Sequence, residues 1–77
     1  MKRCISLLGS TGSIGRQTLQ VARNLRLRVC ALAAHSNIKL LEQQVREFHP
    51  HLAAVYDPQA ARALRTKIAD TNTKVLA

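Results

Sequence analysis

The chain has 77 residues and a mass of 8.5 kDa, which allows one small domain and excludes a large active-site cleft built between two domains. Hydrophobic residues make up 47% of the sequence, a proportion typical of a packed globular unit. The net charge of +8 and the pI near 10.9 favour anionic partners such as phosphates, nucleic acid or anionic lipid.

The first half of the chain predicts a strand, a helix and a second strand. Cys4 to Leu8 is a short apolar run ended by Gly9, as expected for a buried strand. The next segment has helical periodicity, with an expected apolar stripe of Ile14, Thr18, Val21, Ala22 and Leu25. Val29 to Ala34 is a continuous apolar run, which predicts a strand covered on both faces.

The second half repeats this alternation. Ser36 or Asn37 caps a second helix that Pro50 closes, with an apolar stripe of Ile38, Leu41, Val45 and Phe48. A third strand runs from Leu52 to Tyr56. Asp57-Pro58 then starts a third helix striped by Ala61, Leu64 and Ile68, and Lys74 to Ala77 forms a fourth strand.

The order β-α-β-α-β-α-β predicts an α/β fold, because parallel strands need helical crossovers. We expect a truncated, Rossmann-like, doubly wound parallel sheet with three layers.

The cysteines and the apolar runs bear on where the protein resides. Cys4 and Cys30 stand far apart in apolar runs without a C-x-x-C motif, which predicts buried thiols in a reducing compartment. No apolar run approaches the roughly 18 residues of a membrane span, and we recognise no secretory signal or transit peptide. We therefore expect a cytoplasmic protein without a membrane partner.

A glycine-rich turn lies between the first strand and the first helix. It places glycines at positions 9, 12 and 15, so that the backbone can turn tightly and approach a pyrophosphate closely. The following helix N-terminus offers free N–H groups to an anion. The predicted cofactor-binding residues here are Gly9, Thr11, Gly12, Ser13, Ile14 and Gly15. A tight turn that holds no ligand is the alternative.

The end of the second strand predicts which dinucleotide binds. NAD-specific sites place an Asp or Glu there, on the ribose 2′-hydroxyl. This chain instead has His35, Ser36 and Asn37, with Lys39 close by, and these groups suit a 2′-phosphate. We expect NADP(H), with a solvent-facing loop histidine as the alternative for His35.

Other titratable residues give weaker signals. His49 and His51 flank Pro50, but no third ligand lies at metal-binding spacing, so we expect a surface turn. Glu42 and Glu47 lie on the second helix, away from the strand ends, and neither is predicted to be catalytic. The chain therefore contributes no predicted catalytic or metal-binding residue.

Several segments together resemble a known family. They are LLGSTGSIGRQTLQVAR at 7–23, ALAAHSN at 31–37, the residues Glu42, Gln43, Phe48 and Pro50, and the pair Ala54-Val55. The chain resembles, over essentially its whole length, the opening portion of 1-deoxy-D-xylulose 5-phosphate reductoisomerases. By this resemblance, Thr11 to Ile14 contact the NADPH phosphates, and Ser36 and Asn37 hold the 2′-phosphate end. Many members carry glycine where this chain has His35.

The resemblance also implies what a full-length relative does. Such an enzyme isomerises 1-deoxy-D-xylulose 5-phosphate and reduces the product with NADPH to 2-C-methyl-D-erythritol 4-phosphate, in isoprenoid biosynthesis. It is a homodimer that uses Mg²⁺ or Mn²⁺, held by carboxylates in a later domain. Residues 1–77 would be a partial NADP-binding domain, inactive alone because the catalytic, metal-binding and C-terminal regions lie outside it.

Two alternatives remain open. The charge of +8 is compatible with a stand-alone basic module that binds nucleic acid or phosphate, although only Phe48 and Tyr56 are available for stacking on bases. The same fold also begins other NADP-linked reductases, because fold does not fix chemistry.

Overall fold

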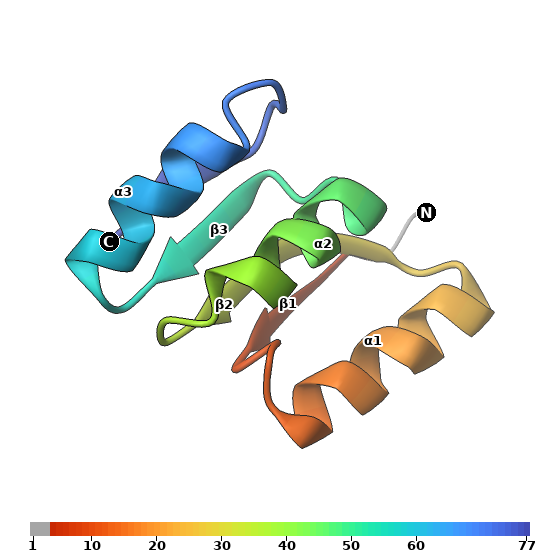
Figure 1. Ribbon diagram of the computed structural model, residues 1–77. Helices are drawn as coiled ribbons and strands as arrows, with labels where there is room; N and C mark the ends of the chain where they lie inside the picture. Colours follow the sequence, from red (N-terminus) through yellow and green to blue (C-terminus); the bar gives the residue numbers. More distant parts are fainter. Residues whose placement is uncertain (1–3) are drawn as a thin grey trace.

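The computed structural model describes residues 4–77 (Figure 1). Its elements are β1 (Cys4–Leu8), α1 (Ser13–Leu25), β2 (Arg28–Ala34), α2 (Ile38–Phe48), β3 (Leu52–Val55), α3 (Pro58–Lys67) and β4 (Lys74–Leu76). This is the predicted alternation, with β3 and β4 each ending one residue earlier than expected. None of the helices described is long and apolar enough to cross a membrane.

The four strands form one parallel sheet in the order β1-β2-β3-β4, which confirms the Rossmann-like α/β expectation. The pairing of β1 with β2 contains one irregularity. Ile5 is opposite Val29, but Ser6 is opposite Ala31, so that Cys30 is an extra residue in β2. A bulge of this kind bends the strand locally.

The second helical layer expected for a doubly wound sheet is absent from residues 4–77. Because the strand order follows the chain order, right-handed crossovers all step in one direction and place their helices on one face. Figure 1 shows α1, α2 and α3 together on one side of the sheet. Helices cover the opposite face only where the strand order reverses, and here it does not.

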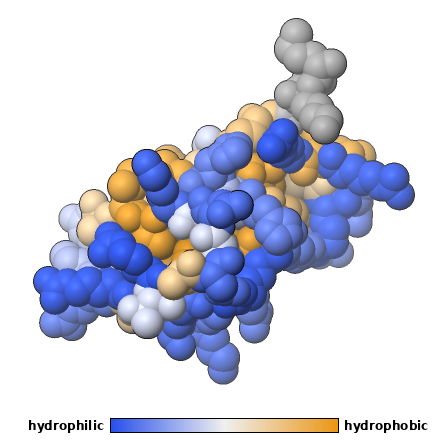
Figure 2. Space-filling view, turned by 90° about the horizontal axis from the view of Figure 1, so that it is seen from above, coloured by the Kyte–Doolittle hydropathy of each residue, from blue (hydrophilic) through white to orange (hydrophobic). Residues whose placement is uncertain are grey.

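The core lies between this helical layer and the sheet. Leu32, Ala53 and Val75 are paired across β2, β3 and β4, and all three are buried. The adjacent row of side chains points to the other face of the sheet. It ends at Leu76, which is 49% exposed. Figure 2 shows hydrophobic atoms reaching the surface between hydrophilic side chains. The sheet is therefore packed well on one face only, and β2 is not covered on both faces as expected.

The apolar stripe of α1 differs from the prediction. The buried residues are Gly15, Leu19 and Ala22, whereas Ile14 is 79% exposed and Val21 is also exposed. A different side of α1 from the predicted one faces the sheet, because Gly15 packs against the turn that precedes the helix. The stripes predicted for α2 and α3 are confirmed, with Leu41, Val45, Ala61, Leu64 and Ile68 buried.

The expectation of two free, buried thiols is wrong. Cys4 and Cys30 form a disulfide across β1 and β2, with a Cα–Cα distance of 5.5 Å. Cys4 is exposed and Cys30 is half-buried. The sequence separation of 26 residues conceals this contact, because the crossover returns the chain to a strand directly beside β1.

Candidate functional site

The turn between β1 and α1 is held by main-chain hydrogen bonds. Gly9 has a φ of +69°, in the left-handed region that favours glycine. The Gly12 amide donates to the Gly9 carbonyl (3.1 Å), and the Ser10 amide donates to the Ala33 carbonyl of β2 (2.9 Å). These bonds fix the turn at the carboxyl edge of the sheet, where parallel α/β sheets bind ligands.

Gly15 packs directly on this turn. A Cβ atom at Gly15 would lie 2.2 Å from the Gly9 carbonyl oxygen and 2.8 Å from the Ser10 Cα, far inside any tolerated contact. A Cβ atom at Gly12 would lie 3.6 Å from the same oxygen, which is ordinary contact. Gly15 therefore has to lack a side chain for α1 to begin this close to the end of β1.

The first turn of α1 presents main-chain amides to an anion. The N-cap residue Gly12 has no side chain to cap the helix, and the Arg16 amide donates to the Gly12 carbonyl (2.9 Å). The amides of Ser13, Ile14 and Gly15 precede that bond and have no acceptor within the helix. The first turn also contains no acidic residue. A helix start of this kind suits a phosphate.

Side chains at the same place can add to those amides. Thr11 is half-buried in the turn, and Ser13 is exposed at the first position of α1. Each supplies a hydroxyl group that can donate to a phosphate oxygen. The structure thus brings together six of the predicted residues, Gly9, Thr11, Gly12, Ser13, Ile14 and Gly15, at one end of the sheet.

A buried glutamine of α2, which no sequence motif indicated, hydrogen-bonds to the turn. Gln44 is 6% exposed, and its side-chain amide donates to the Ser10 carbonyl oxygen (2.8 Å). Ser10 itself is fully buried. Within residues 4–77, Gln44 Oε1 and Ser10 Oγ have no hydrogen-bond partner, so both retain bonding capacity beside the turn. One signal in the sequence could have indicated this residue: Gln44 is a polar residue directly before Val45, which belongs to the predicted apolar stripe of the second helix.

The other predicted residues follow β2 at the same edge. His35, Ser36 and Asn37 are all exposed. Asn37 is the N-cap of α2, because its Oδ1 atom accepts from the Leu40 amide (3.3 Å), which decides between the two predicted capping residues. Its side-chain NH₂ group has no bond within the described part of the chain. This turn therefore presents a hydroxyl, an amide and an imidazole to solvent.

One carboxylate lies closer to this turn than the sequence indicates. Asp57 follows β3, and its main-chain amide donates to the His35 carbonyl (3.0 Å). It is the N-cap of α3, its side chain makes no capping bond, and the residue is half-buried. Asp57 belongs to the neighbouring strand end, whereas the ribose-binding acid of NAD sites follows the second strand itself.

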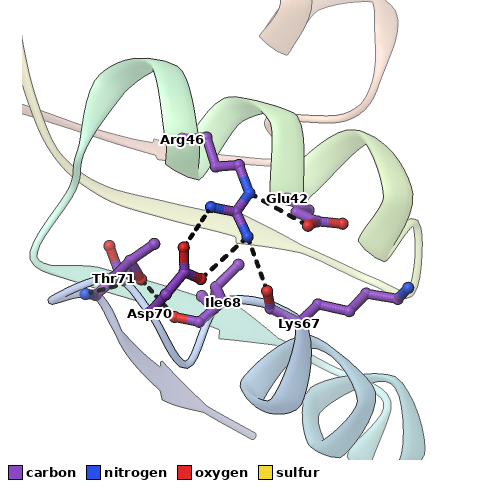
Figure 3. Close-up of polar contacts among 7 residues, drawn as sticks. Glu42, Arg46, Lys67, Ile68, Asp70 and Thr71 are labelled. Atoms are coloured by element: carbon purple, nitrogen blue, oxygen red, sulfur yellow. Dashed lines mark hydrogen bonds and ion pairs between the residues drawn. The ribbon is translucent and has the colours of Figure 1, made fainter.

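The remaining carboxylates are engaged by arginines on the helical side. Arg46 pairs with Asp70 (2.9 Å) and with Glu42 (3.3 Å), and it also donates to the Lys67 carbonyl (2.9 Å), as Figure 3 shows. Its hydrogen bonds lower the pKa of Asp70.

Glu47 on α2 is engaged in the same way. Arg23 of α1 pairs with Glu47, and its hydrogen bonds lower the pKa of that carboxyl group. Both Glu42 and Glu47 lie on α2, and neither directly follows a strand.

The two predicted surface histidines lie at the opposite end of the sheet. His49 and His51 line a cavity of about 520 Å³ together with Asp70 and Asn72. Within residues 4–77, no group of three or more His, Cys, Asp or Glu side chains is placed to hold a metal ion. Both histidines are exposed, as expected for a surface turn.

Comparison with known proteins gives a consistent result. The family model of 1-deoxy-D-xylulose 5-phosphate reductoisomerase matches residues 5–77. The reductoisomerase of Acetivibrio thermocellus is 60% identical over 72 residues, which cover 94% of this chain and 19% of that protein. The enzyme of Lachnoclostridium phytofermentans is 57% identical over 74 residues, or 95% of this chain and 19% of its own length. The chain thus spans about a fifth of these relatives.

Solved structures agree. The reductoisomerase of Zymomonas mobilis, in complex with NADPH, superimposes with a TM-score of 0.92 at 34% identity, covering 100% of this chain and 21% of that one. A second reductoisomerase, in complex with NADPH, fosmidomycin and magnesium, gives a TM-score of 0.88 at 33% identity, covering 96% and 19%. The family match, the parallel sheet and the glycine turn together show that the chain belongs to the 1-deoxy-D-xylulose 5-phosphate reductoisomerase family.

Proposed function

We propose that residues 1–77 form the first part of an NADPH-binding domain, with the cofactor's diphosphate at the glycine turn and its 2′-phosphate at the turn after β2. The observation that carries this proposal is the set of amides from Ser13 to Gly15, which have no acceptor within α1 and lie at the end of β1 where Gly15 packs on Gly9. The donor set fits the group, since these amides and nearby hydroxyls are suited to phosphate oxygens.

Each predicted residue has a distinct role in this proposal. Gly9, Gly12 and Gly15 give the turn its shape, with the Gly12 amide bonded to the Gly9 carbonyl, and the amides of Ser13 and Ile14 bind phosphate oxygens with help from the Thr11 hydroxyl. At the second turn, the Ser36 hydroxyl, the Asn37 NH₂ group and the His35 ring surround the 2′-phosphate. When bound, NADPH supplies the hydride; these residues only hold and orient it.

NADPH is favoured over NADH by the charge at the second turn. His35, Ser36, Asn37 and Lys39 bring donors and positive charge without a carboxylate. Asp57 is the nearest acid, but its backbone places it at the end of β3 and at the N-terminus of α3.

We also propose the parent activity that this family membership implies. It is the NADPH-dependent conversion of 1-deoxy-D-xylulose 5-phosphate to 2-C-methyl-D-erythritol 4-phosphate, by a cytoplasmic homodimer that uses Mg²⁺ or Mn²⁺. Catalytic residues, metal ligands and the sugar-phosphate site would belong to further domains, so the 77-residue chain is expected to be inactive alone.

A basic nucleic-acid module is the second candidate, since the net charge is +8. The structure gives it little support. Arg23 and Arg46 are occupied by carboxylates, and the two aromatic residues lie apart, with Phe48 half-buried and Tyr56 exposed. Such modules stack bases on aromatic side chains along a basic groove.

Two experiments test the proposal. Titration of the chain with NADPH and NADH, followed by nucleotide fluorescence, should show saturable binding that favours NADPH; equal affinity or a preference for NADH would contradict it. A single-stranded oligonucleotide should not compete at physiological ionic strength.

The parent activity requires a chimera. Residues 1–77 would replace the matching segment of the Zymomonas mobilis enzyme. The chimera should retain NADPH-dependent turnover, and a chimera that carries Gly15→Val should lose it, whereas the isolated chain should show none. A folded but inactive wild-type chimera would count against the assignment.

A further inference from the structure

Strand β2 bulges at Cys30, and the burial of its neighbours explains why. Val29 and Leu32 are 2% and 1% exposed, and both belong to the core. Residues three apart in a regular strand point to opposite faces, so an extra residue between them is needed to bring both to one face. Cys30 is that extra residue, because the pairing of β1 with β2 skips it. The core therefore requires the bulge.

The bulge leaves Cys30 without a pairing partner on one side. On the β3 side, its carbonyl oxygen accepts from the His51 amide (2.8 Å). On the β1 side, none of residues 4–77 is opposite it, and its link to that strand is the disulfide with Cys4. The two Cα atoms are 5.5 Å apart, which is usual for disulfide-bonded residues. The covalent bond thus replaces the missing pair of the ladder.

Strand β1 depends on this link, because it lies at one edge of the sheet. Within residues 4–77, β2 is the strand that pairs with it. The disulfide holds its amino end, and its carboxyl end leads into the glycine turn, where the Ser10 amide donates to the Ala33 carbonyl (2.9 Å). Loss of the disulfide leaves this turn attached to an edge strand whose pairing is interrupted.

One sulfur of the disulfide is open to attack. Cys4 is exposed, whereas Cys30 is half-buried. Exposed disulfides are reduced more readily than buried structural ones, and regulatory disulfides are of the exposed kind. In the cytoplasm, which the proposed function assigns to the parent enzyme, small thiols keep most cysteines reduced, and the disulfides that form are mostly transient or redox-sensing.

We propose that Cys4 and Cys30 form a reversible thiol–disulfide switch that controls how tightly the glycine turn binds its phosphate ligand. The oxidised pair holds β1 on β2 across the bulge and keeps the turn in its binding shape. The reduced pair releases the amino end of β1 and weakens binding. This inference rests on the proposed function, because NADPH binding is what the switch changes.

The exchange balances with a small thiol such as glutathione as the reductant. A glutathione thiolate attacks the exposed Cys4 sulfur, the S–S bond breaks, and Cys30 leaves as a thiolate that takes up a proton. A second glutathione attacks the glutathione sulfur of this mixed disulfide and releases Cys4. Two electrons pass to the protein, giving two cysteine thiols and one glutathione disulfide. Oxidation by glutathione disulfide is the same sequence in reverse.

A redox titration of the 77-residue chain tests the first half of the proposal. The folded chain is equilibrated with mixtures of reduced and oxidised glutathione, its thiols are trapped by alkylation, and mass spectrometry counts them. The pair should convert fully and reversibly, with the mixed disulfide found on Cys4. A disulfide that stays oxidised in excess reduced glutathione until urea unfolds the chain would overturn the switch and identify a structural bond.

NADPH affinity tests the second half. The reduced chain should bind NADPH about threefold more weakly or worse, because only molecules with an ordered turn are competent to bind. A Cys4→Ser/Cys30→Ser variant should bind as the reduced chain does, whatever the glutathione ratio. In the chimera with the Zymomonas mobilis enzyme, whose further domains support the fold, the KM for NADPH should rise on reduction and fall again on oxidation. The chimera with both serines should not respond.

The outcomes separate this inference from the proposed function. Reversible reduction that leaves NADPH affinity unchanged in both the chain and the chimera overturns the switch and leaves NADPH binding in place. A chimera whose response to glutathione persists in the double serine variant also overturns the switch, because other cysteines would then account for it. Absence of NADPH binding in both redox states, in the chain and in the chimera, overturns both proposals.

Discussion

Gln44 donates a hydrogen bond from inside the core to the carbonyl oxygen of Ser10, at 2.8 Å, and so ties α2 to the turn that precedes α1. The two residues are 34 positions apart in the sequence. The carbonyl that Gln44 binds belongs to the turn that leads directly into the first-turn amides of α1. A single buried side chain thus couples the packing of the second helix to the shape of the proposed phosphate site.

Replacing Gln44 with leucine should lower both stability and cofactor affinity. The Ser10 carbonyl would be left buried without its partner, at a cost of about 1–3 kcal/mol in the free energy of unfolding. Urea denaturation measures the loss of stability, and NADPH titration measures the loss of cofactor affinity that a loosened turn would cause. Gln43→Leu, the same change at an exposed neighbour, is the control. Equal effects of the two substitutions would show that the bond does not hold the turn.

Gly15→Ala should be severely destabilising, whereas Gly12→Ala should leave stability nearly unchanged. The alanine Cβ at position 15 would lie 2.2 Å from a main-chain oxygen, and backbone cannot move aside as a flexible side chain can. We expect a loss of about 3 kcal/mol or more for Gly15→Ala. Chemical denaturation of both variants gives the comparison. A Gly15→Ala chain as stable as wild type would contradict the close packing of α1 on the turn.

Ser36→Asp should reverse the cofactor preference. A carboxylate at the end of β2 repels a 2′-phosphate but accepts a hydrogen bond from a ribose 2′-hydroxyl. We expect NADPH affinity to fall by about tenfold, equivalent to 1.4 kcal/mol, with NADH affinity kept or raised. Parallel titrations with both nucleotides measure the ratio, and Ser36→Asn controls for size without charge. An unchanged ratio would remove Ser36 from the 2′-phosphate site.

Acid should destabilise the chain through its arginine-bound carboxylates. Hydrogen bonds from Arg46 and Arg23 lower the pKa of Asp70 and Glu47 in the folded state. The unfolded chain therefore takes up protons first, at its ordinary pKa values of about 4. The stabilisation is complete above those values and is lost as pH falls through the lower, folded-state values.

Arg46→Met isolates this contribution. Its urea midpoint should lie below that of wild type at pH 7, and the difference should shrink as the pH falls from about 5 to about 2. Arg62→Met, at an exposed arginine of α3, should follow the wild-type curve. A pH-independent difference for Arg46→Met would mean that packing, not charge, accounts for its effect.

Reduction of the Cys4–Cys30 disulfide should lower the free energy of unfolding by about 3 kcal/mol. The bond closes a loop of about 26 residues in the unfolded chain and restricts its freedom. Unfolding curves with and without reductant measure the difference. A Cys4→Ser/Cys30→Ser double variant should show no response to reductant, and mass spectrometry under alkylation should find no free thiol in the oxidised chain.

The sequence predicted the elements well because their signals are local. Short apolar runs predicted the strands, and Asp57-Pro58 predicted the start of α3. The turn was found because its glycines recur at fixed spacing. The stripes of α2 and α3 were right because each helix packs on the sheet in the ordinary way.

Several of the failures concern tertiary contacts that no local sequence pattern shows. The stripe of α1 was misplaced because the position of Gly15 against Gly9 decides which side of the helix faces the sheet. The disulfide was missed because strand adjacency and the bulge at Cys30 set its geometry. Gln44 was passed over for a related reason, since its partner Ser10 lies 34 positions away in the sequence.

The uniform strand order has a consequence for how much of a dinucleotide this chain can enclose. In doubly wound proteins the ligand crevice opens where neighbouring connections diverge to opposite sides of the sheet. Here every connection passes over the same face of the sheet, so β1 forms one side of such a crevice. Residues 4–77 do not include the strand that would form its opposite side. Under the proposed function, residues 4–77 would therefore contact the cofactor from one side of this crevice only.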